Sequence, residues 1–120
     1  MWGRRGGEVG CGVSGRDDGR RLGAAELGTG LGARATLVQF SSAFCAPCRA
    51  TRRVLADVAA MVPGVGHVEI DAESRLELVR AWGVERTPTV LVLDADGRVV
   101  RRAAGLPRKA DVIAALGDAL

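Results

Sequence analysis

Two cysteines separated by two residues constrain this 120-residue chain more than any other feature. Cys45 and Cys48, within the sequence CAPC, follow a short apolar run over residues 36–40 that is typical of a β-strand. Residues 46–61 carry apolar side chains at helical spacing. Where a strand passes into a helix, the first thiol meets unpaired backbone N–H groups and the positive end of the helix dipole. That position favours the nucleophilic thiolate, so the pair indicates a redox site.

The rest of the chain alternates between strand and helix patterns. The pattern predicts strands near residue 22 and over 36–40, 67–71, 90–93 and 99–104, and helices over 24–27, 46–61, 73–82 and 108–119. Strands joined through a helix are expected to pair in parallel, whereas the Asp94–Gly97 turn predicts an antiparallel final pair. We therefore expect an α/β fold with a mixed central β-sheet flanked by helices on both faces.

Helical spacing also predicts which residues face the core. In each of the three long helices, one set of side chains is expected to face the core. In chain order the sets are Ala50, Val54, Val58 and Met61/Val62; Leu76, Val79 and Trp82; and Val112, Ile113 and Leu116. Three arginines, Arg49, Arg52 and Arg53, fall on another side of the helix over 46–61. They are either a solvated face or a source of positive potential beside the thiols.

Charge and composition narrow the function classes. The net charge is +3, of which residues 1–22, with five arginines against three acidic residues, supply +2. Residues 23–120 keep only +1, so no basic face for nucleic acid is expected. No run of 18 apolar residues and no secretory signal is recognised, which predicts a cytoplasmic monomer without membrane contact. Tethering or export through an anchor outside this sequence is the alternative.

The N-terminal residues 1–20 are rich in glycine and arginine and show no period. We expect a disordered or loosely docked tail, followed by one domain over 21–120. Cys11 lies in this tail, either as an incidental thiol or as a regulatory or intermolecular one.

Taken in order, these motifs resemble the thioredoxin family over residues 36–120. The sequence CAPC is similar to the family's Cys-Gly-Pro-Cys and differs from it at Ala46. Thr87-Pro88-Thr89 resembles the family's cis-proline loop. Three further residues fall where the family has matching ones: Asp71, Gly83 and Gly105.

The resemblance implies a thiol–disulfide oxidoreductase that reduces protein disulfides. Cys45 would attack the client disulfide and Cys48 would resolve the mixed disulfide, with Pro47 tolerated in the first helical turn. The dithiol is itself the redox group, so no metal or organic cofactor is expected. The implied partners are disulfide-containing client proteins and an upstream thiol protein or a thioredoxin-reductase-type electron donor. Besides Pro88, the implied substrate groove comprises Phe44, Arg86, Thr87, Gly105 and Leu106.

Besides Ala46, three positions depart from the family pattern. Phe44 stands where thioredoxins usually have Trp, Gln39 replaces the family's buried Asp, and His67 aligns with the Lys partner of that Asp. Glutamine cannot act as a base for Cys48. We expect Gln39 and His67 to form a neutral hydrogen-bonded pair in place of a buried ion pair. The alternative is a histidine that points to solvent at the start of its strand.

Other uses of the two cysteines remain open at this point. A disulfide-forming oxidase or isomerase of the same fold is one alternative, and a redox-silent interaction module is another. A structural zinc site would need four ligands, and the candidates are Cys45, Cys48, Cys11 and His67.

Overall fold

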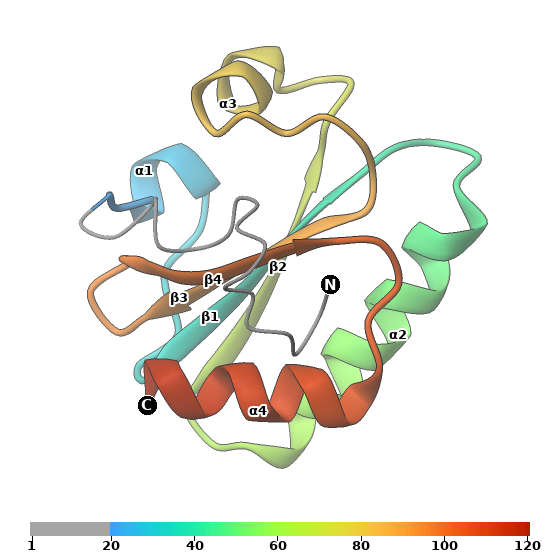
Figure 1. Cartoon of the computed structure of the whole chain (residues 1–120). Coiled ribbons are helices and arrows are strands. Elements are labelled where there is room, and N and C mark those ends of the chain that lie inside the picture. The colour runs from blue at the N-terminus through green and yellow to red at the C-terminus, as the bar shows by residue number, and fades with distance from the viewer. Residues whose placement is uncertain (1–19) are drawn as a thin grey trace, which may run out of the picture.

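Four β-strands form one sheet in the order β2-β1-β3-β4 (Figure 1). The computed structural model describes residues 20–120, so the predicted tail and Cys11 lie outside the described residues. The strands are β1 (Ala35–Ser41), β2 (Val65–Asp71), β3 (Thr89–Asp94) and β4 (Val99–Ala104). The helices are α1 (Ala24–Leu27), α2 (Ala46–Met61), α3 (Leu76–Ala81) and α4 (Lys109–Ala119). No helix within residues 20–120 combines the length and the apolar character needed to cross a membrane.

The strand directions confirm the predicted mixed sheet. β1 pairs in parallel with β2, and the Asp94–Gly97 turn makes β3 and β4 antiparallel, as expected. β3 also runs antiparallel to β1, which the rule for helix-connected strands did not predict. The reason is visible in Figure 1, where α3 lies beyond the end of β2 and the chain enters β3 from that same end. Only the β1–α2–β2 connection is therefore a true crossover.

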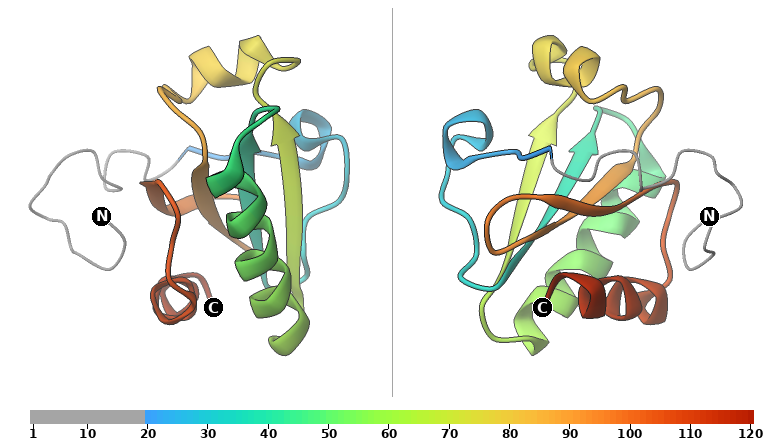
Figure 2. Two further views of the ribbon diagram at one scale, coloured as in Figure 1. Left: turned by 90° about the vertical axis from the view of Figure 1, so that its right-hand side faces the viewer. Right: turned by 60° about the vertical axis from the view of Figure 1, so that its left-hand side comes forward.

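Helices cover both faces of the sheet, as expected (Figure 2). On one face, α2 and α4 pack onto a cluster that includes Leu37, Leu55, Val58, Val90, Val92 and Leu116. On the other face, α1 and α3 pack onto a cluster that includes Leu22, Phe40, Ile70, Leu78, Trp82 and Leu91. Every residue of β1 is buried, because this strand has a neighbour on each side and helices on each face. Burial on both faces accounts for the consecutive apolar residues Leu37 and Val38, whose side chains point to opposite faces of the sheet.

The predicted inward face of α2 was only partly right, since Val58 is buried as expected but Thr51 and Leu55, which were not predicted, are buried with it. The buried residues are Cys48, Thr51, Leu55 and Val58, whereas Met61 is 52% exposed and Val54 packs only partly against the core. The helix must bury Cys48 beside Cys45, and the Thr51 hydroxyl is satisfied by the Pro47 carbonyl at 2.7 Å. A prediction from the spacing of apolar residues overlooks both Cys48 and Thr51.

Two further residues predicted to face inward, Leu76 and Ile113, are exposed. In α4 the inward residues are Val112, Ala115 and Leu116, so Ile113 lies a third of a turn away from the core. α3 begins at Leu76 rather than at residue 73, and its buried residue is Leu78.

The late start of α3 has a local cause in Asp71. One carboxylate oxygen of Asp71 accepts the backbone N–H of Glu73 at 2.9 Å, and the other accepts the Ser74 hydroxyl at 2.8 Å. Such side-chain bonds to nearby groups favour a turn over a helix. The residues after β2 therefore form a turn before the helix begins.

The predicted strand near residue 22 is reduced to a single bridge between Arg21 and Arg98. The Leu22 N–H donates to the carbonyl of Gly97 at 2.9 Å, and a Cβ on Gly97 would lie 2.9 Å from the Leu22 carbonyl oxygen. Gly97 also has φ +86°, which favours glycine. Arg20 stacks on the Trp82 ring at 3.7 Å. This segment therefore ties the β3–β4 hairpin to the end of α3.

Two substitutions in α2 test the revised core face. Leu55 is fully buried, so Leu55→Ala is expected to lower the free energy of unfolding by about 2–5 kcal/mol. Met61→Ala removes a side chain that is half in solvent and should cost less than about 1 kcal/mol. Urea denaturation of the oxidised protein, followed by circular dichroism, measures both. Equal losses from the two variants would contradict the observed orientation of α2.

Candidate active site

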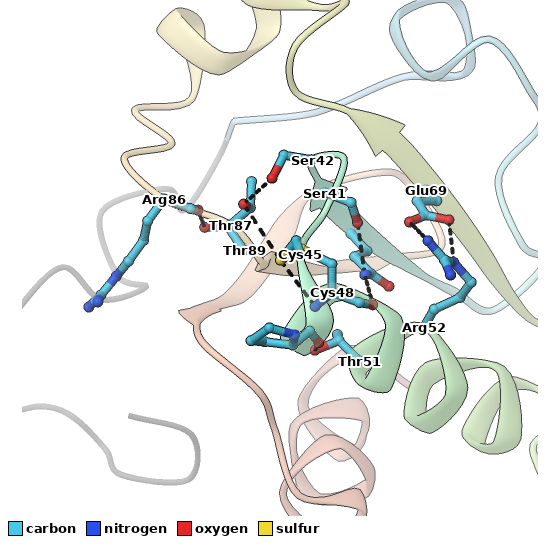
Figure 3. The surroundings of a disulfide bond; sticks show 12 residues. Ser41, Ser42, Cys45, Cys48, Thr51, Arg52, Glu69, Arg86, Thr87 and Thr89 are labelled. Atoms are coloured by element: carbon cyan, nitrogen blue, oxygen red, sulfur yellow. Dashed lines mark hydrogen bonds and ion pairs between the residues drawn. A yellow bond between two sulfur atoms is a disulfide. The ribbon is translucent and has the colours of Figure 1, made fainter.

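Cys45 and Cys48 form a disulfide at the N-terminus of α2 (Figure 3). Their Cα atoms are 5.2 Å apart. Cys45 is the N-cap residue, and its sulfur accepts the backbone N–H of Cys48 at 3.2 Å. Cys48 is fully buried, whereas Cys45 is partly exposed. The expected placement of the first cysteine at the helix start is thus observed, and one sulfur of the pair is accessible.

The local sequence explains how the chain enters this helix. Pro47 lies in the first turn, where its missing N–H leaves no helical bond unmade. Phe44, directly before Cys45, has φ +56°, a left-handed conformation that is uncommon for an aromatic residue. Its side chain is fully exposed. The turn therefore places an aromatic ring in solvent beside the accessible sulfur.

The loop before β3 forms the opposite wall of the site. The Thr87–Pro88 peptide bond is cis, which confirms the cis-proline prediction. Thr87 Oγ1 lies 4.0 Å from Cys45 Sγ, and the Pro88 carbonyl accepts the N–H of Gly105 at 2.9 Å. The Thr89 hydroxyl closes the loop by donating to the Arg86 carbonyl at 2.6 Å. Two hydrogen bonds thus hold this loop in front of the disulfide.

The five predicted groove residues lie in different surroundings. Thr87 lies next to Cys45, and Gly105 is hydrogen-bonded to Pro88. Phe44 and Leu106 are exposed apolar side chains. The Arg86 side chain extends away from the cysteines (Figure 3). The role of each in binding stays a prediction.

Gln39 is buried and holds the first turn of α2 to β1. Its amide nitrogen donates to the Cys48 carbonyl and to the Ser41 hydroxyl oxygen, both at 2.8 Å. The predicted hydrogen bond between Gln39 and His67 is not formed, since neither Gln39 Oε1 nor His67 Nε2 has a partner among residues 20–120. The strand register explains this result, because it places His67 opposite Leu37 and Glu69 opposite Gln39. The alternative of a solvent-facing histidine is also incorrect, because His67 Nε2 is buried.

Sequence reasoning missed an ion pair beside this network. Arg52 donates through two nitrogens to both carboxylate oxygens of Glu69, each at 2.7 Å. These hydrogen bonds lower the pKa of Glu69 below its usual value. The Ser41 hydroxyl also lowers this pKa, whereas burial of the carboxyl group raises it. The sequence could have indicated Glu69 as a neighbour of the site, because it is two residues from His67 and so lies on the same face of β2.

Burial lowers the pKa of His67 below its usual value of 6.5. The Glu69 carboxylate opposes this shift, and the Arg52 guanidinium adds to it. His67 is therefore neutral at neutral pH. Gln39 and His67 are thus two neutral side chains, and the charged groups of this region are Arg52 and Glu69.

The comparisons agree with this geometry. A family model described as a thioredoxin-like domain matches residues 26–120. The chain is 32% identical over 73 residues to thioredoxin H-type 1 of Nicotiana tabacum, which covers 61% of this chain and 57% of that protein. It is 34% identical over 77 residues to a thioredoxin of Chlamydia trachomatis, over 64% of this chain and 74% of that protein.

A solved structure shows the same fold. The solution structure of reduced desulfothioredoxin from Desulfovibrio vulgaris Hildenborough superposes with a TM-score of 0.66 and 27% identity, over 84% of this chain and 93% of that one. Among plant relatives the coverage is lower, since the chain spans between 44% and 58% of three matched proteins.

The buried state of His67 can be tested directly. His67 is the chain's only histidine, so its imidazole NMR signals can be followed through a pH titration without assignment. We expect a pKa below 6.5, and a still lower one in Glu69→Gln, which loses the favourable carboxylate.

The same shift has a consequence for stability. Because the folded-state pKa of His67 is lowered, its neutral form stabilises the fold above about pH 6.5, and this contribution is lost as the pH falls through the folded pKa. As the pH falls from neutral to mildly acidic, the free energy of unfolding should therefore decrease less for His67→Gln than for the unmodified chain. A His67 pKa at or above 6.5 would contradict the buried, neutral assignment.

Proposed function

The chain belongs to the thioredoxin-like family, and from that premise we propose that it reduces protein disulfides by thiol–disulfide exchange. One observation carries the proposal: the Cys45–Cys48 disulfide at the N-terminus of α2 faces the cis-proline loop. A dithiol and a disulfide differ by two electrons and two protons, so this pair can exchange with a client disulfide without a cofactor.

The first step uses the accessible sulfur. In the reduced protein, the Cys45 thiolate attacks one sulfur of the client disulfide. A bond forms between Cys45 and that client sulfur, the client S–S bond breaks, and the second client sulfur leaves as a thiolate. The N-cap position supports this role, since the Cys48 N–H and the helix dipole stabilise negative charge on Cys45 Sγ.

The second step uses the buried sulfur. The Cys48 thiolate attacks Cys45 Sγ, which forms the intramolecular disulfide and releases the remaining client sulfur as a thiolate. The two protons lost by the cysteines equal the two that the client thiols take up. Gln39 positions the first turn through the Cys48 carbonyl, but its amide cannot accept the Cys48 proton. Solvent or the departing client thiolate would take that proton.

The substrate surface follows from the same geometry. We propose that a client strand lies against Thr87 and Pro88, with Gly105 beside them and with Phe44 and Leu106 as apolar contacts. The exposed side chains of Phe44 and Leu106 support this assignment. Ala46, between the cysteines, is exposed and leaves the approach to Cys45 open.

A regeneration step must return the disulfide to the dithiol. We propose an upstream thiol protein or a reductase of the thioredoxin-reductase class as electron donor, in the cytoplasm, where thiols are kept reduced. Cell fractionation tests the location. The direction of exchange depends on the reduction potential of the pair: roughly −270 mV would mark a reductase and about −120 mV a disulfide-forming oxidase.

Single cysteine variants test the two roles. Cys45→Ser removes the attacking thiolate, so dithiothreitol-driven insulin reduction should fall to the uncatalysed rate. Cys48→Ser keeps the attack but cannot resolve it, so mixed disulfides with insulin chains should accumulate and be visible by non-reducing electrophoresis. Cys11→Ser is the matched control and should retain turnover. Undiminished insulin reduction by Cys45→Ser would refute the assignment, and a wild-type chain without activity would favour a redox-silent module.

A further inference from the structure

The turn between β1 and α2 brings a hydroxyl group to the edge of the site. Ser42 Oγ lies 2.9 Å from Thr87 Oγ1, and Thr87 Oγ1 lies 4.0 Å from Cys45 Sγ (Figure 3). All three residues are partly buried. The contact joins the turn after β1, the loop before Pro88 and the N-cap of α2 in one short chain of polar atoms.

The number of protons fixes the direction of these hydrogen bonds. A threonine hydroxyl has a single proton to donate. When that proton points to the Cys45 sulfur, the Thr87 oxygen acts as an acceptor toward Ser42, and Ser42 becomes the donor of the 2.9 Å bond. The order of donation is then Ser42 to Thr87 to Cys45. Without Ser42, the Thr87 hydroxyl would lose the partner that orients it.

We propose that Ser42 is a positioning residue, which holds the Thr87 hydroxyl as a hydrogen-bond donor to Cys45 Sγ and so stabilises the Cys45 thiolate. The inference rests on the proposed function in one respect, that the reduced form of Cys45 is the attacking group. It adds a residue outside the CAPC sequence and the proline loop to the control of the redox couple.

The effect differs between the two redox states. A disulfide sulfur is a neutral and weak acceptor, whereas a thiolate accepts charge-assisted hydrogen bonds. In a partly buried site such bonds are stronger than in water, and two hydroxyls in series polarise one another. The Ser42–Thr87 pair therefore stabilises the dithiol form more than the disulfide form. It shifts the exchange equilibrium toward reduced protein and increases the thiolate fraction of Cys45.

The first experiment measures the redox equilibrium. The full chain is equilibrated with mixtures of reduced and oxidised glutathione, and the states of the peptide that contains Cys45 and Cys48 are quantified by mass spectrometry. Ser42→Ala is expected to shift the equilibrium toward the disulfide by about fivefold, the size of one ordinary hydrogen bond. Ser42→Thr keeps a hydroxyl and should restore most of this difference.

A double-variant comparison shows whether Ser42 acts through Thr87. Thr87→Val removes the donor to the sulfur and should shift the equilibrium at least as far as Ser42→Ala, whereas Thr87→Ser keeps a donor. Adding Ser42→Ala to Thr87→Val should then change almost nothing. An equal Ser42→Ala effect in both backgrounds, or no effect in either, would overturn the proposal.

The second experiment reports on Cys45 alone. In a Cys48→Ser background, the rate of alkylation of the Cys45 peptide by iodoacetamide follows the thiolate fraction as the pH is varied. Ser42→Ala should move this rate profile to higher pH, and Ser42→Thr should not. A profile that Ser42→Ala leaves in place would count against the proposal. Circular dichroism of each variant checks folding, and the Thr87 variants keep the test decisive if Ser42→Ala does not fold.

The outcome is separable from that of the proposed function. Neither experiment needs a client or turnover, since both follow the cysteines themselves. A wild-type chain that fails to reduce insulin but shows the Ser42 and Thr87 effects would refute the proposed function alone. An active chain whose couple is unchanged by Ser42→Ala would refute this inference alone.

Discussion

The hydrogen bond from Gln39 to the Cys48 carbonyl is the contact on which the site depends. β1 is buried over its whole length between two strands and two helical layers, so it is the most constrained part of the fold. Gln39 fixes α2 to this strand at the turn of the helix that contains the disulfide. The short connection of residues 42–44 then delivers Cys45 to the surface while Cys48 stays buried. The two cysteines therefore differ in exposure at a fixed place beside β1.

An amide side chain at position 39 leaves the interior beside Cys48 without a buried carboxylate. A buried carboxylate would carry a large desolvation cost and would titrate as the couple changes state. Gln39 avoids both effects, and His67 is kept neutral by burial. The charged groups, Arg52 and Glu69, lie nearer to solvent, where pairing costs little desolvation. The interior beside Cys48 is therefore neutral around pH 7. The hydrogen-bond donors to Cys45 Sγ are likewise neutral: the Cys48 N–H and the Thr87 hydroxyl.

Element order, strand directions around β1–α2–β2 and the hairpin were predictable from local patterns, whereas the cis-proline loop was predicted only through the resemblance to the thioredoxin family. Helix faces were predicted less well, because burial of Cys48 and Thr51 rotates α2 away from the face that its apolar residues alone suggest. The Asp71 turn shortened α3 through side-chain hydrogen bonds that periodicity does not register. Within the site, the cysteines and Pro88 lie in motifs, so they could be found. The Gln39 partners, the Arg52–Glu69 pair and the Ser42–Thr87 contact are side-chain contacts between different elements, which no local pattern records. Contacts of β1 and β2 also depend on strand register, and a slip of one residue turns every side chain of a strand to the other face.

The two outer strands bear charged side chains that are already engaged elsewhere. On β4, Arg101 pairs with Asp118 of α4, and Arg102 donates to the Gly83 carbonyl at 3.2 Å. On β2, Glu69 is held by Arg52 of α2. A second chain that tried to extend the sheet would have to pack against these charged groups or displace them, and charged edge strands are one of the ways in which proteins resist such addition. The arginines that are bound along these two edges thus protect the sheet from edge-to-edge pairing with other chains.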